Sequence, residues 1–401
     1  MTPVKRAQDR SESLRFLIKL AASHPIAGVP SDDGLAVLAS EHRMQGLVTS
    51  ELDSHEDAAS KTLRTRLASI EGQTWARHRF LASELNRVSS MLTERGVEHY
   101  LIKGPAVEGR FYDRVGERPY ADLDIVLLPP ASVVDALEAL EGASPHSHLV
   151  GKLADDGWIQ SVDVTLPSGA VVDLHIDPLK LGFQSRFSST AGSHLESMTI
   201  DGTTINTLDP TASLVLALLH LNRNRFRYLS GFADVARLLT RSQIDWDVFE
   251  GLVLADGLEV LIDGSLHAVL DELDLEADLI DGWTLRYNPD PGPRRAVWKL
   301  AWRRSTRLSG TAGRFRMSRR SQFLMPALCR GRFVWLVRWM MRRLFPPTPL
   351  LEFNHPSASG PYLIRLVRGR WSQIRHTRFH RRDRSNRRSH LVDEELGGPA
   401  E

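Results

Sequence analysis

The spacing of apolar positions divides the chain into segments of different character. Apolar residues recur at helical spacing over residues 11–95, as in the series Leu81, Leu85, Val88 and Leu92, and predict an N-terminal helical region over residues 1–96 that ends at Arg95-Gly96. Strand and helix patterns mix over residues 97–208, and helical spacing returns over residues 209–288. We therefore expect a mixed α/β sheet core flanked by helical regions.

Short apolar runs bounded by glycine, proline or aspartate mark the strands of this core. The expected strands cover residues 97–102, 121–128, 159–166 and 170–176, with a further hairpin over residues 197–208. The expected helices cover residues 105–113, 131–140 and 232–239, and another begins at Asp209-Pro210.

Two aspartates interrupt the apolar strand at residues 121–128. Because successive strand side chains point to opposite faces, Asp122 and Asp124 should share one face. Like charges on an apolar strand disfavour ionisation of both carboxyl groups unless a cation lies between them. Carboxylate oxygens suit Mg²⁺, which also takes phosphate oxygens and water.

A second interpretation of this pair is solvated polarity at a sheet edge. An Asp-x-Asp triplet is expected about once by chance in a chain of this composition. It recurs here as Asp245-Trp246-Asp247, in a polar segment that leads into a helix. Only the first copy lies in an apolar strand and follows a Lys-Gly turn.

The order Lys103-Gly104, Arg118 and Asp122-Leu123-Asp124 resembles the uncharacterised nucleotidyltransferase family of the DNA polymerase beta-type superfold, whose members carry a KG...R...DxD run. The resemblance covers most of the chain and is strongest over residues 101–128. It implies an α/β (α+β) nucleotidyltransferase-like core that uses two Mg²⁺ ions to transfer a nucleoside monophosphate from an NTP to an acceptor hydroxyl. The Gly-Ser signature of the superfold is absent, and Lys103-Gly104-Pro105 stands in its place.

The resemblance also implies roles for particular residues. Asp122, Asp124 and Asp173 would be catalytic and metal-binding, with Asp173 on a strand beside the Asp-x-Asp strand. Lys103 and the Gly104 backbone would contact the triphosphate with Arg118 nearby, since an N–H-rich turn that opens a helix binds anions. The alternatives are an ordinary surface lysine at residue 103 and a structural salt bridge at Arg118.

Two further residues have more than one interpretation. His175 shares a face with Asp173, and a strand histidine is more often a hydrogen-bonded residue than a metal ligand. Asp234 stands where the family carries an acid on this helix, but its charge is equally explained by a solvated helix face.

Composition adds a basic C-terminal region to this picture. Residues 286–390 hold 26 of the 51 lysines and arginines but three of the 49 acids. We divide this part into an Arg/Trp-rich helical region at residues 289–370 and a tail at residues 371–401 that we expect to be disordered. An amphipathic helix around Trp335 and Trp339 could lie on an anionic membrane surface, bind single-stranded nucleic acid or pack on the acidic body.

The single cysteine, Cys329, excludes an intramolecular disulfide and a Cys-based zinc cluster. The first 20 residues lack an apolar core of signal-peptide length, and we expect a cytoplasmic protein, peripheral at the inner membrane surface if the basic region binds lipid. The competing function is a catalytically silent adaptor that binds membrane or nucleic acid through the basic region. Convergence of Asp173 with Asp122 and Asp124 would favour the enzyme.

Overall fold

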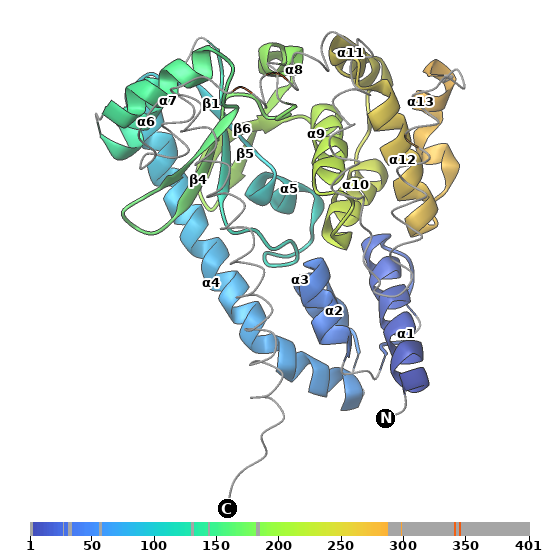
Figure 1. The fold of residues 1–401 in the computed structure, drawn as a ribbon. Helices are drawn as coiled ribbons and strands as arrows, with labels where there is room; N and C mark the ends of the chain where they lie inside the picture. The colour runs from blue at the N-terminus through green and yellow to red at the C-terminus, as the bar shows by residue number, and fades with distance from the viewer. Residues whose placement is uncertain are drawn as a thin grey trace, which may run out of the picture. The chain divides into compact units, whose positions relative to one another are not determined.

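The structure is a computed structural model that describes residues 3–26, 28–30, 34–55, 58–129, 132–142, 145–181 and 185–287, with residues 298, 341 and 345. The chain divides into two compact units, residues 1–336 and 337–401. Every helix and strand with assigned bounds lies in the first unit (Figure 1). The amphipathic helix predicted around Trp335 and the tail at residues 371–401 lie outside the described residues.

Helices occupy the N-terminal region, as the spacing of apolar residues predicts. They are α1 (Pro3–Ala21), α2 (Gly34–His42), α3 (Gln45–Leu52) and the long α4 (Ala58–Glu94). After α4 the chain turns at Gly96, whose φ of 70° is a left-handed conformation that glycine tolerates.

The described residues form a six-stranded mixed sheet, which confirms the predicted fold class. Its strands are β1 (His99–Ile102), β2 (Leu123–Leu127), β3 (Ser161–Thr165), β4 (Val171–His175), β5 (Leu195–Ile200) and β6 (Thr203–Leu208). They lie in the order β3-β4-β2-β1-β6-β5, and β3-β4 and β5-β6 are antiparallel hairpins as predicted. β2 is antiparallel to β1 and parallel to β4, so the strand after Asp122 lies inside the sheet.

The observed elements differ from the predicted ones at their ends. The strand expected at residues 121–128 begins at Leu123, so Asp122 precedes β2 instead of lying within it. The two helices expected near it are α5 (Gly104–Phe111) and α6 (Val133–Glu141). A further helix, α7 (Pro145–Asp155), was not predicted because its apolar positions form too short a periodic run.

Helices resume around the last two strands. α8 (Arg186–Thr190) and the 3₁₀ helix η1 (Ala191–Ser193) precede β5. After β6 come α9 (Pro210–Arg223), α10 (Leu229–Arg241), α11 (Trp246–Asp256), α12 (Glu259–Leu273), the 3₁₀ helix η2 (Ala277–Ile280) and α13 (Asp281–Arg286).

Aspartates cap two of these helices. The Asp209 carboxylate accepts a hydrogen bond from the Ala212 N–H at 2.7 Å, and this confirms the predicted start of α9. Asp245 accepts from the N–H groups of Asp247 and Val248 at 3.0 Å each. The second Asp-x-Asp triplet is therefore explained by helix capping at Asp245 and by an exposed ion pair between Asp247 and Arg286.

Helices lie on both sides of the sheet. α6 and α7 are on one side, and α5, α9 and α10 are on the other (Figure 1). Ile102 and Val126 belong to the same buried cluster as the leucines of α9 and α10. Asp124 lies two residues before Val126 in the same strand, and residues two apart point to the same face of a sheet. The Asp124 side chain is therefore on the α9 side.

The core of the helical region extends past its expected boundary at residue 288. Trp298 is 5% exposed, and its ring centroid lies 5.9 Å from that of Phe226. Among the described residues, none of the helices combines the length and apolar character that crossing a membrane requires.

Candidate active site

Asp124 and Asp173 are neighbours across two parallel strands. Asp124 in β2 is the register partner of Asp173 in β4, and side chains at paired positions point to the same face of a sheet. The Asp124 and Asp173 side chains are 9% and 13% exposed. The structure thus brings the acid predicted on a neighbouring strand directly beside the Asp-x-Asp strand.

His175 lies against both carboxylates. Its Nε2 atom is 2.9 Å from Asp124 Oδ1 and 3.2 Å from Asp173 Oδ2, and the side chain is fully buried. Ionised carboxylates only accept hydrogen bonds, so Nε2 carries the hydrogen that it donates to them. His175 is thus a hydrogen-bonded strand histidine in this structure. The ligand atoms of Asp124, Asp173 and His175 also lie within 4.8 Å of one another and could hold a metal ion, provided that the imidazole nitrogen facing the ion carries no proton.

Each carboxylate also has a lysine partner. Lys103 Nζ is 2.5 Å from Asp124 Oδ1, and Lys180 Nζ is 2.5 Å from Asp173 Oδ2. Asp173 Oδ1 is buried and has no hydrogen-bond partner among the described residues. The negative charge of the two carboxylates is therefore balanced by two lysine ammonium groups, and Asp173 Oδ1 is left as an acceptor without a donor among the described residues.

These cations determine which acids are readily ionised. Burial alone would raise the pKa of Asp124, but Lys103 and His175 outweigh it and hold that pKa well below its usual range. Burial is likewise outweighed at Asp173, where His175 and Lys180 lower the pKa. Burial and then the Asp124 charge raise the pKa of Asp122. Repulsion between the two acids therefore disfavours ionisation of Asp122, whereas Asp124 is ionised readily.

The turn between β1 and α5 has an unusual backbone. Lys103 and Gly104 have φ angles of 54° and 23°, and such a conformation costs a non-glycine residue about 1–3 kcal/mol. The Lys103 carbonyl accepts from the Val107 N–H at 2.9 Å, so the turn opens the helix as predicted. The Lys103 side chain is 11% exposed, which contradicts its interpretation as an ordinary surface lysine.

Arg118 is held by the acid on α10. Its Nε atom lies 2.9 Å and 3.0 Å from the two Asp234 oxygens, and its Nη2 lies 2.9 Å from Oδ2. The Tyr112 hydroxyl donates a further hydrogen bond of 2.7 Å to Asp234. Asp234 is thus buried in a polar network and not on a solvated face, and the salt-bridge interpretation of Arg118 holds in this structure.

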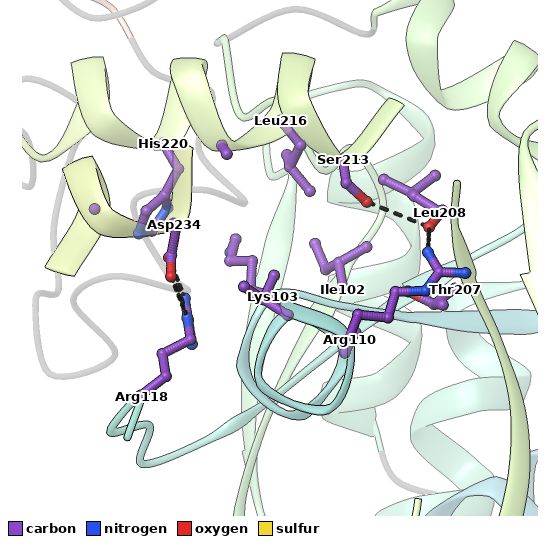
Figure 2. Close-up of a pocket in the computed structure, with 14 residues that line it drawn as sticks. Ile102, Lys103, Arg110, Arg118, Thr207, Leu208, Ser213, Leu216, His220 and Asp234 are labelled. Carbon is purple, nitrogen blue, oxygen red and sulfur yellow. Dashed lines mark hydrogen bonds and ion pairs between the residues drawn. The ribbon is translucent and has the colours of Figure 1, made fainter. Parts of the chain in front are cut away.

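A small cavity lies beside Lys103, between α5, α9 and α10, and Figure 2 shows His220 and the Arg118–Asp234 pair at one end of it. It encloses about 30 Å³, which admits water but not a nucleotide. Burial and then the charge of Lys103 lower the pKa of His220 well below its usual range, so its imidazole is neutral. The lining residues are Ile102, Lys103, Ala106, Val107, Arg110, Arg118, Thr207, Leu208, Ser213, Leu216, Ala217, His220, Gly231 and Asp234.

Three charged residues near the carboxylates were not singled out from the sequence. Asp163 in β3 is the exposed register partner of Asp173. Pairing the predicted hairpin residue by residue would have found it. Lys180 follows β4, and Arg223 at the end of α9 is within electrostatic reach of Asp173 and Asp124. Neither cation has a local sequence pattern, because its position depends on how the chain returns to the sheet.

Residues 31–270 match the model of a family described as uncharacterised nucleotidyltransferase. The match includes the sheet, α2 to α11 and most of α12. No curated protein matches the chain.

Proposed function

The chain belongs to the uncharacterised nucleotidyltransferase family, and we propose that it transfers a nucleoside monophosphate from an NTP to an acceptor hydroxyl at the Asp124–Asp173 pair. The acceptor oxygen forms a bond to the α-phosphorus. The bond from that phosphorus to the oxygen leading to the β-phosphate breaks, and pyrophosphate leaves.

The observation that carries this proposal is the position of Asp173. Its carboxylate is in register with that of Asp124, and one oxygen of Asp173 is buried without a hydrogen-bond partner among the described residues. An unused buried acceptor is costly unless a ligand satisfies it. Oxygen donors from paired carboxylates fit Mg²⁺, so the residues present suit the ion that the family resemblance implies.

Each acid has a separate role in the proposal. Asp122, Asp124 and Asp173 would hold two Mg²⁺ ions, which when bound stabilise the attacking and leaving oxygens of an in-line displacement. Asp173 would also accept the proton of the acceptor hydroxyl. Burial and the Asp124 charge raise the pKa of Asp122, and a cation bound beside this carboxylate would offset both effects.

The Lys103-Gly104 turn would bind the phosphate chain. The turn lies at the start of α5, where backbone N–H groups such as that of Gly104 can bind an anion. The Lys103 ammonium supplies a compact positive charge beside Asp124. Arg118 would also contact the phosphate chain of the NTP, although its guanidinium is bound to Asp234 in the structure. On nucleotide binding, Arg118 would therefore exchange the Asp234 carboxylate for a phosphate oxygen.

The competing adaptor function depends on residues 289–370, most of which lie outside the described part of the chain. The arrangement of Asp124, Asp173 and His175 favours the enzyme over this adaptor, because an adaptor needs no buried carboxylate pair. Binding of an anionic membrane or of nucleic acid by the basic region stays a prediction.

Label transfer tests the proposed reaction. The intact protein should be incubated with Mg²⁺, a cell extract and each of the four NTPs labelled at the α-phosphate. We expect label from at least one NTP to enter an extract component, and Asp122→Asn/Asp124→Asn to abolish it. Asp173→Asn should lower turnover roughly 10²–10⁴-fold and largely preserve NTP binding, since it removes general-base help.

The matched control is Asp247→Asn, the same change in the triplet that caps α11, where the Asp247 side chain is 83% exposed. This variant should transfer label as the unaltered protein does. Transfer that persists in the double variant would refute the assigned site. Absence of transfer from every NTP would favour the adaptor.

A further inference from the structure

Two lysines reach the carboxylate pair from backbone conformations that lysine rarely adopts. Lys103 has a φ of 54° and Lys180 a φ of 48°. Positive φ costs a non-glycine residue about 1–3 kcal/mol and persists where the surrounding structure enforces it. Each Nζ atom lies 2.5 Å from an aspartate oxygen, so both strained residues serve the same pair of acids.

Hydrogen bonds to the buried Asp177 carboxylate hold the segment that carries Lys180. Asp177 is 1% exposed, and its carboxylate accepts hydrogen bonds of 2.9 Å from the Leu179 N–H and the Ser185 hydroxyl. It also accepts a hydrogen bond from the Ser185 N–H at 2.5 Å. These contacts hold the chain just after β4, so that the Lys180 side chain returns to Asp173 and is 14% exposed.

Lys180 occupies one oxygen of Asp173 while the other has no partner. The ammonium is 2.5 Å from Oδ2, and Oδ1 is buried without a hydrogen-bond partner among the described residues. A divalent cation at the pair would supply the charge that Lys180 now supplies, and it would repel the ammonium across a short distance. Lys180 would then need another anionic partner within reach of its flexible side chain.

We propose that Lys180 is a phosphate-binding residue of the nucleotide site, held in place by Asp173 until the metal and nucleotide bind. When they bind, the protonated ammonium moves from Asp173 to an oxygen of the phosphate chain, and no proton is transferred. A lysine ammonium suits this exchange because it is a compact charge with three donors on a flexible stem. This inference rests on the proposed function and adds a residue to the same site.

Binding measurements on the intact protein test this role without relying on turnover. Lys180→Met removes the charge, Lys180→Gln is a second neutral variant should the first fail to fold, and Lys180→Arg restores the charge. Mn²⁺ alone should bind the neutral variants roughly tenfold more tightly than the unaltered protein, because the competing ammonium is gone. A non-hydrolysable NTP at saturating Mn²⁺ should bind them about tenfold more weakly.

The matched control is Lys152→Met, which changes an exposed lysine of α7, and it should leave both affinities unchanged. Lys180→Arg should restore most of the NTP affinity. If the unaltered protein binds both ligands and the neutral variants keep full NTP affinity, Lys180 is only a structural partner of Asp173 and the inference fails alone. If the unaltered protein binds neither ligand, the proposed function fails and this inference fails with it.

Discussion

His175 joins the two carboxylates of the candidate site into one unit. Its Nε2 atom is within 3.2 Å of an oxygen of each, and the imidazole is fully buried. Without that donor, the two acids would face each other with only their lysine partners. The histidine therefore stabilises the protein in the absence of metal, and a bound cation could replace this contribution.

Replacing the imidazole tests this idea. His175→Phe should lower the free energy of unfolding by about 1–3 kcal/mol in the presence of a chelator, because buried acceptors lose their donor. Addition of Mg²⁺ should recover more stability in this variant than in the unaltered protein. His175→Gln, whose side-chain amide NH₂ group can still donate to the carboxylates, is the control and should lose less. Equal urea midpoints for all three proteins would contradict this role.

The sequence predicts part of the site at the scale of single residues. Period-two alternation places Asp122, Asp124 and Asp173 in or next to apolar strands, and the structure puts Asp124 and Asp173 in register. The ionisation of these acids could not be predicted in the same way. It depends on Lys180 and on the position of His175 against both acids, and these contacts come from tertiary structure.

The Arg118–Asp234 pair connects two elements. Arg118 lies in the segment between α5 and β2, and Asp234 lies in α10. The two side chains are 12% and 10% exposed, so removing either one leaves a largely buried charge. The pair thus fixes the segment that leads into Asp122 against the helix that lines the cavity.

A double-mutant cycle measures this connection. Arg118→Met and Asp234→Leu should each destabilise the protein by about 3–5 kcal/mol, and the double variant should lose clearly less than their sum. Arg79→Met is the control, because its partner Asp201 forms an exposed pair that should contribute about 1 kcal/mol or less. Additive losses in chemical denaturation would show that the two residues act independently.

Predictions of element type were more successful than predictions of element ends. Apolar spacing identified the strands of both hairpins, and the Asp209-Pro210 signal correctly predicted the start of α9. The expected strand at residues 121–128 was too long, since Asp122 lies outside the ladder of hydrogen bonds. Sheet pairing sets these ends, and single-residue propensity does not encode it.

At the scale of the whole molecule, the helical core includes a residue far along the chain. A Cβ atom added to Gly264 in α12 would lie 2.1 Å from the Trp298 indole. This contact could not be predicted from the sequence, because Trp298 follows a Pro/Gly-rich stretch and lies in an arginine-rich segment. Composition therefore placed Trp298 in the basic region at residues 289–370 instead of the helical core.

Two glycine substitutions test this packing. Gly264→Ala should lower the free energy of unfolding by about 1–3 kcal/mol, since the indole must move to avoid the new methyl group. Gly251→Ala in α11 is the matched control, because its added Cβ meets no atom within 4 Å. It should be neutral or stabilising by up to about 1 kcal/mol through helix propensity. Urea denaturation that shows the same change for both variants would contradict the packing of Trp298 on α12.

The most direct test of the central claim is to locate the metal and nucleotide in a crystal. The intact protein should be crystallised with Mn²⁺ and a non-hydrolysable NTP, and anomalous scattering should be measured for manganese. We predict manganese peaks bound by Asp122, Asp124 and Asp173, with the α-phosphate beside them and Lys103 directed at the phosphate chain. A nucleotide bound elsewhere, or an Asp124–Asp173 pair that still holds both lysines and no manganese when nucleotide is present, would contradict the account.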